Sequence, residues 1–158
     1  DKKEKETFAK EDLEEWRQWI INGTVERVPP EQEKDIPKEN IITPPMRFVR
    51  TNKAKDKTLN AKSRMIIPGH TDPQIGSYRT DAPTTSLMAV MVCATISVGM
   101  RWSCMTFDVS TAFLSGMEVT RQVYAKAPRE GLPAAEGWEA VPPFALLKLL
   151  KGAYGLTE

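Results

Sequence analysis

Cysteine and histidine are scarce in this chain, and long hydrophobic runs are absent. Its two cysteines, Cys93 and Cys104, lie 11 positions apart in apolar surroundings, and His70 is the single histidine. This supply argues against a zinc site, which usually takes four Cys and His ligands. We expect both cysteines to be buried and reduced, as is typical of intracellular proteins. No window approaches the roughly 18 apolar residues of a membrane span, and no signal peptide is visible.

The net charge of +1 hides an uneven distribution of charge along the chain. Residues 1–40 hold 8 basic and 12 acidic side chains, whereas residues 41–80 hold 8 basic and 2 acidic ones. A local excess of Lys and Arg attracts phosphate-bearing partners such as nucleic acids. A solvated, lysine-rich hairpin would give the same pattern, so charge alone leaves both interpretations open.

Hydrophobic periodicity predicts an α+β fold. We expect residues 1–12 to form a charged, disordered tail and residues 13–158 to form the domain. Helices are predicted over residues 10–21 and 87–98, the second buried on most sides and capped by Thr84 or Thr85. The proline-rich segment 29–45 is expected to be an extended connector without regular structure. Strands are predicted over residues 24–28, 46–51, 61–67, 101–109, 119–125 and 144–150, the second and third forming a hairpin.

The most informative stretch is MTFDVSTAFLSG, residues 105–116. Asp108 ends a predicted apolar strand, and a turn follows at once. Free backbone N–H groups gather at such a turn and bind phosphate oxygens, while a carboxylate there can hold a divalent metal beside the phosphate. A helix N-cap is the simpler role for the same aspartate, so the local pattern leaves both roles open.

Residues 107–116, FDVSTAFLSG, resemble the first catalytic motif of copia-type LTR-retrotransposon reverse transcriptases. The resemblance covers residues 13–158, and it departs from the family pattern at Pro68-Gly69-His70, at Asp81 and at Thr157-Glu158. Other family-like segments follow in the family's order: WRQWIINGTVERV at 16–28, KSRMI at 62–66, Tyr78 with Ala82-Pro83, Val123-Tyr124 with Pro128, and LLKGAYGL at 149–156.

The resemblance implies roles for the residues of this motif. Asp108 would be the first metal-binding carboxylate, and the carbonyl of Val109 a further metal ligand. The backbone N–H groups of Thr111, Ala112 and Phe113 would approach the incoming triphosphate. The ring of Phe113 would also exclude a 2′-hydroxyl and so favour deoxynucleotides, although a core aromatic residue would fit this position equally well.

The resemblance also implies a nucleotide-binding role for four residues outside the motif. Lys62 and Arg64 would lie on the fingers hairpin and hold the triphosphate, and side chains at i and i+2 of a strand do point to one side. Tyr154 and Gly155 would lie near the nucleotide and the template. An exposed hairpin face and a plain turn are the corresponding structural alternatives.

Reverse transcriptases join nucleotides with two Mg²⁺ ions, which clamp the attacking 3′-oxygen and the leaving pyrophosphate. The family supplies two further carboxylates in a Tyr-x-Asp-Asp hairpin, but no Asp-Asp pair occurs in this sequence. The resemblance therefore implies the fingers and the first part of the palm of an RNA-directed DNA polymerase, inactive as this segment alone. Its partners would be an RNA or DNA template-primer, deoxynucleoside triphosphates and the rest of the polyprotein, in a cytoplasmic particle or the nucleus.

Two alternatives to an intact polymerase segment stay open. One is a truncated or decayed copy that keeps only nucleic-acid binding, and the other is an α+β interaction domain with a coincidental motif. The basic hairpin offers a test of binding. If about four of its basic side chains reach phosphates, the log–log salt slope should be roughly −3 to −4. The basic residues considered are Arg47, Arg50, Lys53, Lys55, Lys57, Lys62 and Arg64.

Overall fold

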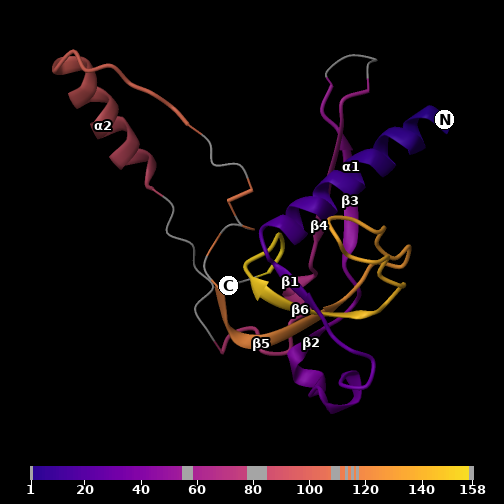
Figure 1. Ribbon diagram of the computed structural model, residues 1–158. Helices are drawn as coiled ribbons and strands as arrows, with labels where there is room; N and C mark the ends of the chain where they lie inside the picture. The colour runs from indigo at the N-terminus through magenta and orange to yellow at the C-terminus, as the bar shows by residue number, and fades with distance from the viewer. Residues whose placement is uncertain are drawn as a thin grey trace.

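A four-stranded sheet, a two-stranded hairpin and two α-helices build the described part of this mixed α+β protein, which confirms the predicted class (Figure 1). The computed structural model describes residues 2–54, 59–77, 85–107, 111, 112, 114, 116 and 118–156. None of the helices described is long and apolar enough to cross a membrane. The helices are α1 (Lys2–Ile21) and α2 (Leu87–Gly99), with 3₁₀ turns at Glu33–Asp35, Lys38–Asn40 and Gly69–Thr71. The strands are β1 (Val25–Arg27), β2 (Ile41–Ile42), β3 (Arg47–Asn52), β4 (Ala61–Ile66), β5 (Glu118–Lys126) and β6 (Leu146–Lys151).

The larger sheet has the strand order β1-β6-β5-β2. β6 pairs antiparallel with both β1 and β5, and β2 runs parallel to β5 at the edge. Leu147 and Leu149 of β6 are almost completely buried, as is Val123 of β5. Burial of such aliphatic side chains is the main favourable contribution to folding, so the centre of this sheet is the centre of the core.

α1 supplies the largest buried side chains, Trp16 and Trp19. The indole N–H of Trp16 donates to the carbonyl oxygen of Pro133 at 3.1 Å, and its ring meets that of Trp138 edge to face. The helix begins at Lys2, so residues 2–12, which were expected to belong to a disordered tail, are helical. It ends before Gly23, which has φ +61 and is suited to the left-handed turn that follows many helices.

The predicted hairpin is confirmed. β3 and β4 pair antiparallel from Arg47 opposite Ile66 to Asn52 opposite Ala61. Along β4, Ser63 and Met65 are buried, and the strand packs against α1. Because side chains alternate between the two faces of a strand, this packing leaves Lys62 and Arg64 exposed on the opposite face.

The hairpin is joined to the larger sheet by the turn after β6. The N–H of Ile67 donates to the carbonyl oxygen of Tyr154 at 2.8 Å, and the N–H of Gly69 donates to that of Gly155 at 3.1 Å. Gly155 has φ +88, and a Cβ atom there would lie 2.1 Å from the carbonyl oxygen of Ile67. Only glycine fits this backbone conformation and spacing without rearrangement.

Two predictions about local structure were wrong. Segment 29–45 contains two 3₁₀ turns and the strand β2, because Ile42 pairs beside β5 and is fully buried. Residues 102–107 form no strand, since no β-ladder of the described chain includes them. Alternation favours an extended conformation, but a strand also needs a neighbour with which to form hydrogen bonds.

The prediction that the second helix is buried was also wrong. α2 forms at the predicted place, but none of its residues is buried, and Figure 1 shows it extending away from the sheet. Its hydrogen bonds are local, whereas burial requires a surface to pack against. Its N-cap is Ser86, whose hydroxyl accepts from the N–H of Ala89 at 3.2 Å, rather than Thr84 or Thr85. Cys93 and Cys104 are likewise exposed, because both belong to this outlying region.

Gly155→Ala should destabilise the protein by about 2–4 kcal/mol, because the new Cβ would meet the Ile67 carbonyl in a left-handed backbone conformation. Gly23→Ala is the matched control. Gly23 also has positive φ, but nothing lies within 4 Å of its Cβ position, so its cost should be about 1 kcal/mol. Urea unfolding measures both free energies. Equal decreases in the free energy of unfolding of the two variants would show that the close approach of the two segments contributes nothing to stability.

Candidate functional site

Three of the residues assigned to the catalytic motif, Asp108, Val109 and Phe113, lie outside the described residues. Thr111 and Ala112 are described and lie in a turn, in which the N–H of Leu114 donates to the Thr111 carbonyl at 2.9 Å. Leu114 is fully buried, and its carbonyl oxygen accepts the Thr24 hydroxyl at 3.4 Å. The turn that follows the proposed catalytic aspartate is thus fixed to the core beside β1.

Lys62 and Arg64 project from the exposed face of β4, side by side at i and i+2. The register places Thr51 opposite Lys62 and Val49 opposite Arg64, and Arg47 follows on the same face of β3. We call the basic side chains of Arg47, Lys62 and Arg64 the hairpin face. Such an exposed set of cations is suited to bind the oxygens of a phosphate chain.

Tyr154 and Gly155 meet this face at its base. The guanidinium carbon of Arg64 lies 5.5 Å from the centre of the Tyr154 ring, within the range of a cation–π contact. Gly155 packs on Ile67, one residue beyond β4. Three residues that the sequence assigned to nucleotide binding, Arg64, Tyr154 and Gly155, are therefore neighbours although they come from distant parts of the chain.

Arg50 was among the basic residues considered for phosphate binding, but it lies on the opposite face of the hairpin. Its guanidinium binds both carboxylate oxygens of Asp12, the closer at 2.6 Å, and also reaches Glu130 at 3.3 Å. The hydrogen bond to Asp12 is the main cause that raises the pKa of Arg50. This arginine holds α1, β3 and the loop after β5 together, so we count it as a structural residue.

Glu15 lies beside the free edge of β4 and was missed by the sequence analysis. Its Oε1 accepts the N–H of Met65 at 3.2 Å and the indole N–H of Trp19 at 3.1 Å. Burial raises the pKa of Glu15, while these two hydrogen bonds and the charges of Lys62 and Arg64 lower it in part. The sequence did contain a signal that Glu15 is buried, because this acidic residue lies on the same face of the helix as Trp16 and Trp19.

The pKa of Tyr154 is also affected by the charges of Glu15 and Arg64. Burial raises it, the negative charge of Glu15 raises it further, and the positive charge of Arg64 lowers it. The charges of Glu15 and Arg64 thus both affect the Tyr154 hydroxyl, at the base of the hairpin face.

Asp108 and Val109, the magnesium ligands that the resemblance implies, lie outside the described residues. Within the described ranges, no group of three or more His, Cys, Asp or Glu side chains could hold a metal ion. The hairpin face is cationic, and its neighbours Val49 and Thr51 are neutral, so the chemistry on this side of the hairpin is suited to anionic ligands.

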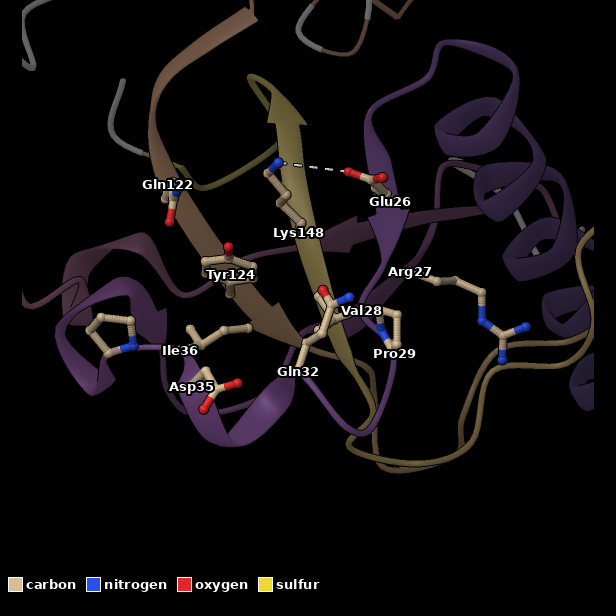
Figure 2. Close-up of a pocket in the computed structure, with 11 residues that line it drawn as sticks. Glu26, Arg27, Val28, Pro29, Gln32, Asp35, Ile36, Gln122, Tyr124 and Lys148 are labelled. Atoms are coloured by element: carbon tan, nitrogen blue, oxygen red, sulfur yellow. Dashed lines mark ion pairs between the residues drawn. The ribbon is translucent and has the colours of Figure 1, made fainter.

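A separate hollow of about 520 Å³ lies on one face of the larger sheet (Figure 2). Tyr124, Lys148 and Glu26 lie abreast on β5, β6 and β1, and Lys148 forms an ion pair with Glu26 at 3.7 Å. Pro29 and Ile36 line its wall. The hollow was not anticipated from the sequence, because the wall comes from the segment that was expected to lack structure. It shares no residue with the hairpin face.

Comparison with protein-family models, with curated proteins and with solved structures found no match to this chain.

The hairpin face should give nucleic-acid binding a salt slope of about −2 to −3, lower than expected from the sequence because Arg50 is already paired. Lys62→Gln combined with Arg64→Gln should reduce the slope by about 2, since two phosphate contacts are lost. Fluorescence anisotropy with an RNA–DNA duplex over a range of KCl concentrations measures it. Lys34→Gln with Lys38→Gln removes the same charge from an exposed segment elsewhere and should leave the slope unchanged. A flat salt response of the wild type would contradict a role in binding.

Glu15 should make stability depend on pH. Its pKa in the folded state is above the ordinary value of 4.5, so its contribution is fully present below that value and is lost as the pH rises through the folded pKa. Glu15→Gln removes this loss. The stability of the variant relative to wild type should therefore increase with pH through the window and then stay constant. Urea unfolding between about pH 4 and pH 8 tests this, and a difference independent of pH would contradict it.

Proposed function

We propose that this chain is the fingers and the first part of the palm of an RNA-directed DNA polymerase of the copia retrotransposon type. The observation that carries the proposal is the contact of Arg64 with Tyr154, beside Gly155 and on the same strand face as Lys62. The resemblance assigns all four residues to nucleotide binding. Arg64, Tyr154 and Gly155 are neighbours although they come from β4 and the turn after β6, and Lys62 lies on the same strand face as Arg64.

In the proposed reaction, Lys62 and Arg64 hold the oxygens of the incoming triphosphate. Arg64 presents several N–H donors in a fixed plane, which match phosphate oxygens in pairs, and Lys62 supplies a point charge. The cation–π contact with Tyr154 restricts the guanidinium of Arg64, so less rotational freedom is lost on binding. Bound Mg²⁺ would neutralise the developing charge and lower the barrier to attack by the primer 3′-oxygen.

The remaining roles follow from the sequence motif. Asp108 would bind Mg²⁺ with the carbonyl of Val109, and the N–H groups of Thr111 and Ala112 would approach the triphosphate. Phe113 would occupy the space that a 2′-hydroxyl needs. The partners in this proposal are a template-primer, deoxynucleoside triphosphates and the rest of a polyprotein, inside the cell.

The second candidate function is nucleic-acid binding without polymerisation, as in a decayed copy. The exposed position of Lys62 and Arg64 favours it equally, because phosphate binding by these side chains does not need the catalytic carboxylates.

Primer extension on an RNA template separates the two functions. The 158-residue chain alone should not incorporate nucleotides, because it lacks the paired aspartates of the family. A protein extended through a Tyr-x-Asp-Asp hairpin should do so with Mg²⁺. In that protein Asp108→Asn should reduce the rate on the order of 100-fold or more, because metal ions supply several kcal/mol of transition-state stabilisation.

Controls for this assay come from the same chain. Asp35→Asn changes an exposed aspartate far from the motif in sequence and should leave the rate unchanged. Full activity of the Asp108→Asn variant, or sustained incorporation by the 158 residues alone, would overturn the assignment of the catalytic carboxylate. Binding without incorporation by the extended protein would favour the second candidate.

A further inference from the structure

The hollow on the larger sheet holds polar side chains that the proposed function does not use. Tyr124, Lys148 and Glu26 form its floor, because the register sets Tyr124 opposite Lys148 and Lys148 opposite Glu26 on three neighbouring strands. Its wall is apolar where Pro29 and Ile36 line it (Figure 2). A hollow of about 520 Å³ is within the size range of protein sites that bind small molecules.

The hydroxyl of Tyr124 has no hydrogen-bond partner among the described residues. Tyr124 is only 8% exposed, and Figure 2 shows its hydroxyl pointing into the hollow. No fully enclosed side-chain oxygen or nitrogen of the described residues is unpaired, so this oxygen must be accessible from the hollow. Nearly buried hydroxyl groups in proteins are usually hydrogen-bonded, because an unpaired one costs free energy. The fold thus presents a hydrogen-bond donor that a ligand in the hollow can use.

Lys148 supplies a positive charge beside this hydroxyl. Its Nζ lies 3.7 Å from a carboxylate oxygen of Glu26, and the two side chains are 36% and 60% exposed. Exposed ion pairs of this kind are weak, so Lys148 can exchange Glu26 for another anion. Arg27 also lines the hollow, but its guanidinium points away from Lys148 in Figure 2 and forms an ion pair with Glu139 at 3.8 Å.

We propose that this hollow binds a small organic carboxylate with an apolar body. The Tyr124 hydroxyl donates a hydrogen bond to one carboxylate oxygen, and the ammonium group of Lys148 binds the carboxylate in place of Glu26. Hydrogen bonds to an ionised group are stronger than those between neutral groups. The apolar body of the ligand packs on Pro29 and Ile36, which removes apolar surface from water.

Two acidic side chains limit the charge that such a ligand can carry. Glu26 and Asp35 both line the hollow, and they repel a doubly charged phosphate ester more strongly than a singly charged carboxylate. A neutral ligand would lack the attraction of Lys148. The hollow shares no residue with the hairpin face, so this inference does not rest on the proposed function.

Three probes separate the charged head of the ligand from its body. Benzoate has both, benzamide has the body without the charge, and acetate has the head without the body. Each is titrated into the full 158-residue chain and followed by ¹H–¹⁵N NMR. We expect benzoate to bind with a Kd on the order of 1 mM and to shift the signals of Tyr124 and Lys148. Benzamide and acetate should bind at least about 5-fold more weakly.

The probes can each overturn part of the proposal. Benzamide that binds as tightly as benzoate would overturn the choice of a carboxylate, and acetate that binds as tightly would overturn the role of the apolar wall. Unchanged signals of Tyr124 and Lys148 at about 20 mM benzoate, well above the expected Kd, would overturn the site itself.

Three variants test the roles of the floor residues. Tyr124→Phe should weaken benzoate binding about 5-fold and leave the urea midpoint unchanged, because its hydroxyl has no described partner to lose. A purely structural tyrosine would give the opposite result, lower stability with unchanged affinity. Lys148→Met should weaken binding about 10-fold. Glu26→Gln should strengthen it about 2-fold, because it removes the anion that competes for Lys148.

Lys151→Met is the matched control for Lys148→Met. Lys151 is on the same strand but does not line the hollow, and its ammonium group donates to the Asn22 carbonyl oxygen at 2.7 Å. Its effect on benzoate binding should be less than about 1.5-fold, and an effect equal to that of Lys148→Met would contradict the site. If Lys148→Met fails to fold, Tyr124→Phe and the three probes still decide the question.

The hairpin variant separates this inference from the proposed function. Lys62→Gln combined with Arg64→Gln should leave benzoate binding unchanged, because neither residue lines the hollow. Loss of benzoate binding in this double variant would place the anion on the hairpin face. That result would overturn the inference and leave the proposed function intact.

Discussion

The close approach of two backbone segments holds this structure together. Residues 67–69 after the hairpin and residues 154–155 after β6 share two hydrogen bonds, and Gly69 and Gly155 each lie where a side chain would strike the other segment. This junction adds to two other links between the hairpin and the rest of the fold, the ion pair of Arg50 with Glu130 and the hydrogen bond from the N–H of Met46 to the carbonyl oxygen of Lys126. Tyr154 lies next to Arg64 because of the junction, so the same contact positions the candidate site.

α1 supports the candidate site from the other side. Its tryptophans fill the core, while Asp12 and Glu15 hold alternate residues of β4. Buried carboxylates are costly unless they are hydrogen-bonded. In this protein Asp12 and Glu15 each accept a hydrogen bond from β4, the strand that carries Lys62 and Arg64. The acidic N-terminal segment and the basic middle segment seen in the sequence are thus partners within one folded unit, besides any charged ligand that they attract.

Local patterns predicted the local structure well. The hairpin, β1, β5 and β6 follow from alternation and turn residues, and the outward pairing of Lys62 with Arg64 follows from their i, i+2 spacing. The junction at Gly155 and the contacts of Glu15 depend on chain segments far apart in sequence, and no local pattern encodes such contacts. Burial of α2 was predicted from its composition, but composition shows only that a helix can be buried, and the packing surface decides whether it is.

The exposed apolar surface of this chain is concentrated just before the proposed catalytic aspartate. α2 carries no charged residue, and Leu87, Met88 and Val98 are each at least 75% exposed, while Met105 and Phe107 reach 88%. Covering exposed apolar patches of this kind lowers the free energy of the protein, because apolar surface is removed from water. In the sequence, Asp108 directly follows Phe107, whereas the hairpin face rests on contacts already made. The proposed anion binding by the hairpin and the proposed metal binding by Asp108 would therefore have different structural requirements, and a chain could fulfil the first without the second.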